Sequence, residues 1–182
     1  MFDKIPYAIR NLPSRLRGIK QELARTSLMQ KVGNVGSLAE LRATVTRADG
    51  RVEQYGVLSR RVVTDAGVNW LASAFLNTVE PETLNFHDCG TGTTAEAAGQ
   101  TALVTPYGGA RATGTQSTPG SVNIYRSVAT INFTSSLAIT EHGIFTASTA
   151  GTMFDRSVFA AINVANGDSI QFTWELTLPS GG

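Results

Sequence analysis

The residues of this chain that could do chemistry lie in two short strings, His87-Asp88-Cys89 and Glu141-His142. Imidazole, thiolate and carboxylate groups are zinc ligands, so a metal site could form if these strings lay on neighbouring strands. Adjacent residues of a strand point to opposite faces, however, so His87 and Asp88 could not both enter one site without a bulge. We therefore expect no metal site. Glu141 and His142 should form local hydrogen bonds, and Cys89 should pack as a small apolar residue.

Nucleophilic catalysis would require His87 or His142 as a base beside Cys89 or one of the many Ser and Thr residues. The sequence has no Gly-x-Ser-x-Gly elbow, and abundant Ser and Thr are typical of exposed strand faces and turns. An enzyme stays an alternative only if His87 and His142 converge in a pocket. We expect no catalytic residues.

The glycine-rich string from Cys89 to Ala95 superficially matches the fingerprint of dinucleotide-binding folds. That fingerprint requires a βαβ unit with a helix N-terminus at the pyrophosphate, whereas more loop and antiparallel strand are expected here. No lysine follows Lys31, so a phosphate-binding Gly-Lys-Ser/Thr loop is also missing from the rest of the sequence. We expect no cofactor.

The elements that must position these groups are mostly strands, and the clearest is residues 169–178. Polar residues there alternate with apolar ones, namely Ile170, Phe172, Trp174, Leu176 and Leu178. This period of two predicts a half-buried β-strand, because the residues on one face of a helix recur every 3.6 positions. Further strands are expected over 84–89, 122–133, 138–145 and 153–164.

Turn and cap residues predict how the strands connect. Alternation at Leu41, Ala43 and Val45 runs into Asp49-Gly50, which predicts a type I′ hairpin turn with a return strand from Val52. Asn166-Gly167-Asp168 should join the last two strands, with Val158, Ala160, Ile162 and Val164 continuing the core face.

Between the first hairpin and the later strands, the sequence predicts one short helix and one long loop. Thr64-Asp65 should cap a helix over 66–76 that plugs one end or edge of the sheet, with Trp70, Leu71, Ala74 and Phe75 together on one face. Residues 90–121 are small and polar and resemble a long loop.

The predicted fold class is mainly β: an antiparallel β-sandwich, jelly-roll-like, with one short helix and an N-terminal amphipathic helical arm. We divide the chain into a basic arm, residues 1–36, and a β-sandwich body, residues 37–182, with the long loop at 90–121. At 182 residues, one sizeable core is the expected count.

The arm is strongly basic, with seven Lys or Arg against two acids, while the remaining residues have eight against twelve. Such a segment favours an acidic partner, whether nucleic acid, a membrane or a protein surface. Its apolar residues share one helical stripe without an aromatic anchor, which favours a groove on a partner protein over a membrane. The predicted partner-binding residues are Leu12, Arg15, Leu16, Arg17, Ile19, Lys20, Leu23 and Arg25.

Composition limits the cellular setting. The single cysteine excludes an internal disulfide framework, so a reducing compartment is the default. We find no apolar run of signal-peptide or membrane-span length, which predicts a soluble protein made in the cytoplasm.

Six strings between about residue 40 and the C-terminus carry a family resemblance. They are Val62–Val68, His87–Ala97, Thr101–Val104, Tyr125–Thr130, Ala138–Phe145 and Asp155–Phe159. The most specific is the Ile-Thr-Glu-His-Gly-Ile-Phe sequence from Ile139 to Phe145. Together they resemble small virion structural proteins of tailed bacteriophages, of the head decoration or tail-fibre-like kind. The resemblance implies a non-enzymatic role in many copies, and it leaves head and tail open.

The leading hypothesis is a capsid decoration or cement protein of the virion, made in the host cytoplasm and trimeric. Its partners would be the major capsid protein or other virion subunits, without direct contact to nucleic acid or membrane. Burial of the arm's apolar stripe in a groove would hold shell subunits together. The alternatives are a tail, baseplate or fibre adaptor component, or a carbohydrate-binding module that uses the long loop and exposed aromatic residues.

Overall fold

The structure is a computed structural model that describes residues 38–60, 63–80, 83–121 and 123–178. These residues belong to one compact unit, Ser37–Leu178. The predicted arm and its eight partner-binding residues, from Leu12 to Arg25, lie outside the described residues.

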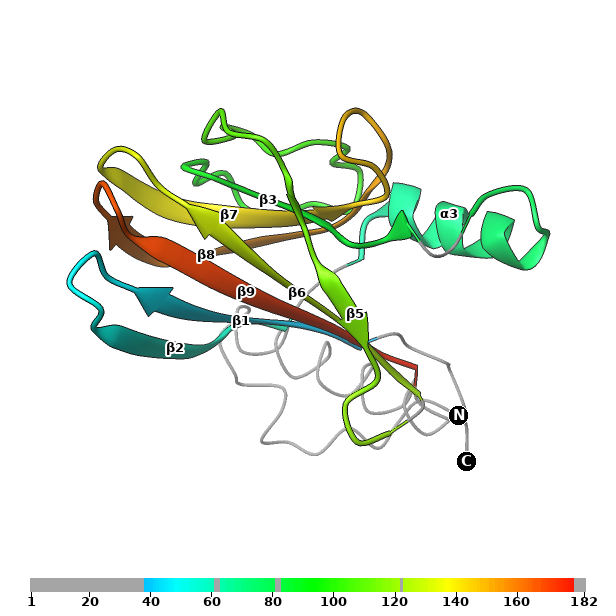
Figure 1. Ribbon diagram of the computed structural model, residues 1–182. Helices are drawn as coiled ribbons and strands as arrows, with labels where there is room; N and C mark the ends of the chain where they lie inside the picture. Colours follow the sequence, from blue (N-terminus) through cyan, green and yellow to red (C-terminus); the bar gives the residue numbers. More distant parts are fainter. Residues whose placement is uncertain (1–37, 61–62, 81–82, 122, 179–182) are drawn as a thin grey trace, which may run out of the picture. The chain divides into compact units, whose positions relative to one another are not determined.

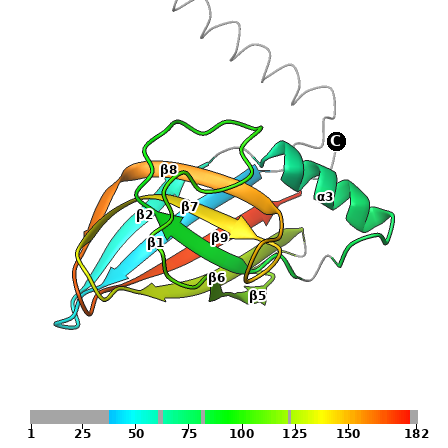
Figure 2. The same cartoon turned by 90° about the horizontal axis from the view of Figure 1, so that it is seen from above.

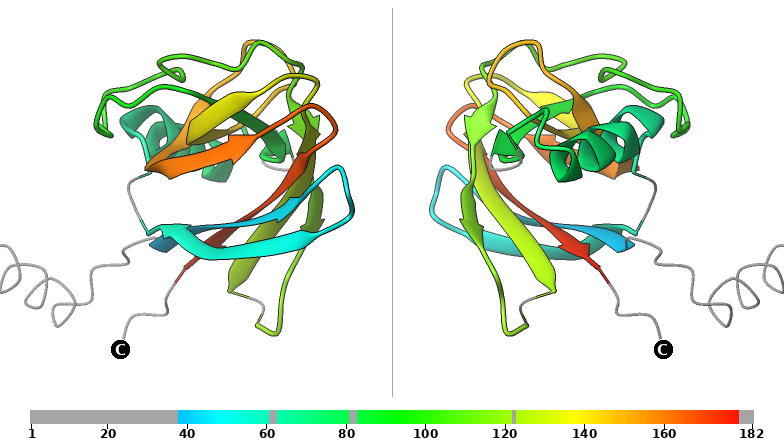
Figure 3. Two further views of the ribbon diagram at one scale, coloured as in Figure 1. Left: turned by 90° about the vertical axis from the view of Figure 1, so that its left-hand side faces the viewer. Right: turned by 90° about the vertical axis from the view of Figure 1, so that its right-hand side faces the viewer.

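Two antiparallel sheets face each other and make up most of this unit (Figures 1 and 3). The first sheet has the strand order β2-β1-β9-β6-β5, and the second has the order β4-β3-β7-β8. The first contains β1 (Leu38–Thr46), β2 (Val52–Ser59), β5 (Thr115–Ser117), β6 (Ile124–Asn132) and β9 (Ser169–Thr177). The second contains β3 (Phe86–Gly90), β4 (Ala112–Thr113), β7 (Leu137–Phe145) and β8 (Met153–Val164). The prediction of an antiparallel β-sandwich with one short helix is confirmed.

The central strand β9 explains how the first sheet packs its core face. Ile170, Phe172 and Trp174 are fully buried, as their alternation predicts. Phe172 lies between Ala43 of β1 and Ala129 of β6, so its ring sits where both cross-strand neighbours are small. Leu178 was predicted on this face but is 40% exposed, because β9 ends one residue earlier.

The hairpin between β1 and β2 forms as predicted, but the type I′ turn is wrong. Only Gly50 in this turn has a positive φ, 84°, whereas a type I′ turn needs positive φ at both central residues. The Gly50 amide donates to the Arg47 carbonyl, and the Arg47 amide donates to the Arg51 carbonyl. This is the pattern of a three-residue loop with glycine in the left-handed position.

The helix α3 (Asp65–Phe75) begins where its cap residue predicts. The Gly67 amide donates to the Thr64 hydroxyl oxygen (3.0 Å), and this hydroxyl donates to the Met153 carbonyl (2.7 Å). A Cβ atom on Gly67 would lie 2.4 Å from the Phe154 carbonyl oxygen, so the helix backbone touches β8 directly. Figure 2 shows α3 beside the sandwich at this edge strand, in agreement with the expected position.

The predicted buried face of the helix is partly wrong. Trp70 is buried and its ring meets Phe154 edge to face, with the centroids 6.0 Å apart. Phe75, however, is 82% exposed and the following Leu76 is 75% exposed. The helix extends beyond the edge of the sheet, so its last turn has no core to cover.

Two β-bulges change the alternation of β8. Between the pairs Ile139–Ile162 and Glu141–Val158, β8 has three residues opposite one of β7. As a result Ile162 and Val164 are buried as predicted, whereas Ala160 is exposed. The second bulge lies between the pairs Ile144–Asp155 and Phe145–Met153, where Phe154 of β8 has no partner residue on β7. Bulges re-aim side chains in this way.

Residues 90–121 are not entirely loop, because they contain the short strands β4 and β5. β4 extends the second sheet beside β3, and β5 extends the first sheet beside β6. In the described residues, no helix is long and apolar enough to cross a lipid bilayer.

Candidate functional site

The two histidines meet in the interior of the sandwich. His87 of β3 and His142 of β7 come from paired strands, and His87 Nδ1 lies 3.0 Å from His142 Nε2. The other nitrogen of His87, Nε2, lies 2.8 Å from the hydroxyl oxygen of Ser127 on β6. The His142 ring also packs against Phe172, with the centroids 4.6 Å apart. Hydrogen bonds therefore connect Ser127, His87 and His142 between the two sheets.

Burial keeps this histidine pair uncharged. It lowers the pKa of His87 to about 3, and burial together with the neighbouring His87 lowers the pKa of His142 well below its ordinary value. A neutral imidazole has one donor and one acceptor nitrogen. Ser127, His87 and His142 can therefore form a hydrogen-bond chain in which every donor points the same way along the chain.

A serine beside two histidines has the composition of a nucleophile, a base and an orienting group. Ser127 is 0% exposed, however, and a Cβ on Gly114 would lie 2.3 Å from its hydroxyl oxygen. The backbone at Gly114 therefore covers the hydroxyl and leaves no room for a substrate. The two histidines converge in a closed core and not in a pocket.

Glu141 lies on the opposite, outer face of β7 and binds the backbone of the long loop. Its Oε1 accepts from the amides of Thr105 (2.7 Å) and Gly92 (3.1 Å), and its Oε2 accepts from the Val104 amide (3.0 Å). Arg156 of β8 donates to Oε2 through Nε (2.8 Å), and its Nη2 lies 2.7 Å from the same oxygen. Burial opposes ionisation, but these hydrogen bonds outweigh it and lower the pKa of Glu141.

We call Glu141 and Arg156, with the amides of Gly92, Val104 and Thr105, the loop clamp. The sequence predicted only local hydrogen bonds for Glu141, whereas these amides are 36 to 49 residues away in the chain. The available signal was a Glu in the middle of the predicted strand 138–145, but nothing in the sequence indicates its partners.

The loop clamp also explains the glycine string that superficially matches a nucleotide fingerprint. A Cβ on Gly90 would lie 2.2 Å from the Thr105 carbonyl oxygen, and one on Gly92 would lie 2.5 Å from Glu141 Oε1. These glycines are needed because other groups approach their Cα atoms closely. Their surroundings are strands and a loop, with no helix at this point.

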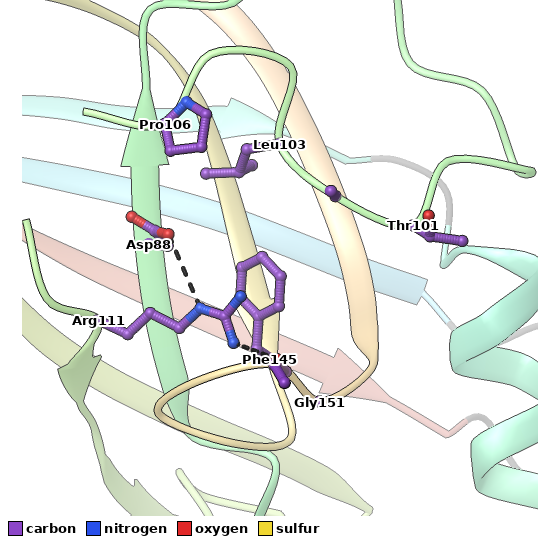
Figure 4. A pocket seen from close by; sticks show the side chains of 9 residues that line it. Asp88, Thr101, Leu103, Pro106, Arg111, Phe145 and Gly151 are labelled. Carbon is purple, nitrogen blue, oxygen red and sulfur yellow. Dashed lines mark hydrogen bonds and ion pairs between the residues drawn. The ribbon is translucent and has the colours of Figure 1, made fainter. Parts of the chain in front are cut away.

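A small pocket opens beside the loop clamp, on the outer face of β3 and β7 (Figure 4). Its volume is about 220 Å³. Asp88 follows His87 on β3 and points to this outer face, as strand alternation predicts. Arg111 lies against the ring of Phe145, with its central carbon 3.5 Å from the ring centroid.

Cys89 packs in the core as predicted, and it is fully buried. Burial raises the pKa of its thiol, so the sulfur stays protonated near neutral pH. Among the described residues, no three or more His, Cys, Asp or Glu side chains are grouped so that they could hold a metal ion.

Comparison of the chain with protein-family models, curated proteins and solved structures found no match in any of the three.

Proposed function

We propose that this chain is a non-enzymatic structural protein of a tailed-bacteriophage particle, and in the leading version a capsid decoration or cement protein. In this proposal residues 1–36 dock in a groove of neighbouring shell subunits and the β-sandwich stays on the surface. The support for a virion is the resemblance of six strings of the sequence, including Ile139 to Phe145. The structure supports the non-enzymatic part, because its buried ionisable groups form hydrogen bonds within the fold.

The observation that carries this proposal is that the groups best suited to chemistry hold the fold together. His87 and His142 are uncharged and closed off in the core, and Glu141 is occupied by four donors of the loop clamp. A catalytic base must reach a substrate within hydrogen-bond distance, and none of these three side chains is open to one. Such an interior is typical of a stable scaffold.

A second support is an uncharged apolar surface on α3. Val68, Phe75 and Leu76 are 53%, 82% and 75% exposed, and they lie with Ala72 at positions i, i+7, i+8 and i+4. Residues at these spacings share one helix face. Exposed apolar groups of this kind mark contact surfaces with other proteins.

The test uses particles of the phage whose genome encodes the chain, stripped of this protein and mixed with purified variants. The full chain should bind in saturable fashion, and the body lacking residues 1–36 should not bind although it stays folded. A matched control replaces Arg15, Arg17, Lys20 and Arg25 by Gln in the full chain, which should weaken binding mainly at low salt. Equal binding by the truncated body would contradict the docking role of residues 1–36.

The copy number separates the leading version from a tail, baseplate or fibre component. Quantitative mass spectrometry of purified particles should give hundreds of copies for a head decoration protein. A count of a dozen or fewer would favour the tail. Absence from the particle would contradict both versions.

A further inference from the structure

The pocket beside the loop clamp has a polar end and an apolar side. Asp88 and Arg111 form the polar end, and Leu103, Pro106 and Phe145 supply apolar atoms (Figure 4). At about 220 Å³ the pocket is below the ~300–1,000 Å³ of sites that enclose drug-sized ligands. It therefore suits one small ring and not an extended chain.

The Asp88 carboxylate has acceptor capacity to spare. Its residue is 7% exposed, and Oδ1 accepts from the Cys89 amide (2.8 Å). The other oxygen, Oδ2, lies 3.8 Å from Arg111 Nε, which is too long for a hydrogen bond. Burial is the largest influence on Asp88 and raises its pKa, because it disfavours the ionised carboxylate. A hydrogen bond donated by a ligand to Oδ2 would act in the opposite direction and stabilise the ionised form.

Arg111 is fixed in place and still has donors available. Its Nη1 donates to the carbonyls of Ala147 (2.8 Å) and Ala150 (2.5 Å), and the central carbon of the guanidinium lies 3.5 Å from the centroid of the Phe145 ring. Its Nη2 has no partner among the described residues. Arg111 Nε and Asp88 Oδ2 lie 3.8 Å apart. The pocket thus presents a donor and an acceptor at neighbouring positions.

The walls of this pocket are held before any ligand arrives. Leu103 belongs to the loop segment whose next two amides are bound by Glu141, and Asp88 and Phe145 lie on the paired strands β3 and β7. Arg111 in turn ties the loop between β7 and β8 through Ala147 and Ala150. A site held this way loses little entropy on binding.

We propose that this pocket binds a single neutral sugar unit, with one hydroxyl donating to Asp88 and an adjacent hydroxyl accepting from Arg111. The two charges cancel within the pocket, which disfavours a free cation or a free anion. A hydroxyl can donate and accept, so a pair of neighbouring hydroxyls satisfies both ends. The C–H face of the ring would lie against Leu103 and Pro106.

The test is an amide NMR titration of the full chain with the methyl glycosides of glucose, galactose, mannose and N-acetylglucosamine. Each is taken to about 50 mM, because a one-sugar site is expected to bind in the millimolar range. At least one glycoside should give saturable shifts at the amides of Thr101, Leu103 and Gly151. Propionamide, methylammonium and acetate serve as probes of the other ligand chemistries.

Two variants locate the site. Asp88→Asn keeps an acceptor for the Cys89 amide but loses the charge, and Ala102→Phe fills the pocket from an exposed position. Each should weaken glycoside binding about tenfold or more. The matched control Asp49→Asn makes the same change in the exposed pair with Arg51 and should leave binding unchanged.

Three results would overturn the proposal: no glycoside shifts the pocket amides, the shifts persist in both pocket variants, or propionamide, methylammonium or acetate binds where glycosides do not. The titration uses the isolated protein and no particle, so its failure says nothing about the proposed virion role. Equally, absence of the protein from particles would leave a measured sugar site intact.

Discussion

At the scale of single residues, buried ionisable groups set how the stability of this protein depends on pH. Asp155 accepts from the Trp174 indole Nε1 (2.9 Å) through Oδ2, and its Oδ1 is buried without a hydrogen-bond partner. Burial raises its pKa to about 7, although the Trp174 hydrogen bond acts in the other direction. Its folded-state pKa is above the unfolded value, so its stabilising contribution is complete below about pH 4 and is lost as pH rises toward 7.

Asp155→Asn should therefore stabilise the protein at pH 8 by about 2–4 kcal/mol relative to the natural sequence, and by little at pH 4. The amide keeps the acceptor for Trp174 and removes the buried charge. Urea unfolding of both proteins from pH 4 to 8 gives this difference. Asp168→Asn is the control of opposite sign, because hydrogen bonds from Ala165, Ala48 and Arg47 lower the pKa of Asp168. If the difference in unfolding free energy between Asp155→Asn and the natural protein did not change with pH, a raised pKa of Asp155 would be contradicted.

The two histidines should show the reverse pH dependence. Their folded-state pKa values are lowered, so stability is complete above about pH 6.5 and falls as pH drops toward 3. They are the only histidines in the sequence, so ring NMR signals report them without interference. Neither ring should titrate between pH 8 and 5 in the folded protein. An ordinary titration near pH 6.5 would show that the pair is open to solvent.

Glu141→Gln should cost about 3–5 kcal/mol, because the buried Arg156 loses its charge partner. Denaturant unfolding measures this cost, and proteolysis should cut within residues 91–106 earlier than in the natural protein. Glu40→Gln is the matched control. Glu40 pairs with Arg42 and Arg60, but both of these arginines are mostly exposed, so the change should stay within about 1 kcal/mol. Equal effects of the two changes would contradict a structural role of the clamp.

At the scale of elements, α3 depends on its close contact with β8. Gly67→Ala should destabilise the protein by about 2 kcal/mol or more, although alanine favours a helix by about 1 kcal/mol. The added Cβ would meet the Phe154 carbonyl at 2.4 Å, and backbone cannot move aside easily. Gly99→Ala is the control, since no atom lies within 4 Å of its added Cβ. Thermal unfolding compares the two, and a stabilised Gly67→Ala would contradict this packing.

The sequence correctly predicts those structural features that are determined by residues close together in the chain. The alternation of β9 and the cap of α3 at Thr64 depend on neighbouring residues, and both are confirmed. The exposed position of Phe75 depends on where the sheet ends, and the exposure of Ala160 depends on a bulge opposite β7. Neither can be read from periodicity, because each is set by another part of the chain.

In the candidate site, too, locally determined features are predicted from the sequence and features set by distant segments are not. Alternation correctly separates His87 from Asp88 on the two faces of β3. The backbone amides that bind Glu141 and the Arg111 side chain that approaches Asp88 come from loops, whose paths the sequence does not predict. Composition alone, rich in small and polar residues, predicts a long loop at 90–121 and does not indicate whether it is ordered. In the structure, hydrogen bonds from the Val104 and Thr105 amides to Glu141 position the central part of this segment.

At the scale of the whole molecule, the exposed apolar face of α3 should serve contacts and not stability. Phe75→Ser with Leu76→Ser should leave the free energy of unfolding within about 0.5 kcal/mol, because both side chains are already exposed. In the proposed function this double variant should bind stripped particles more weakly. Val52→Ser with Val57→Ser, exposed on β2, is the control and should bind normally. Unchanged binding by the α3 variant would remove this face from the contact.

The position of β9 has a consequence for biosynthesis. This strand is the last of the described strands in the chain, yet it lies between β1 and β6 and pairs with both along their full length. A ribosome adding ~5–20 residues per second takes roughly 6 to 25 seconds to pass from the end of β1 at Thr46 to the start of β9 at Ser169. Until β9 is made, β1 has a bare edge, and so does β6 once it has been synthesised. The nascent chain is therefore the form of this protein most in need of a chaperone.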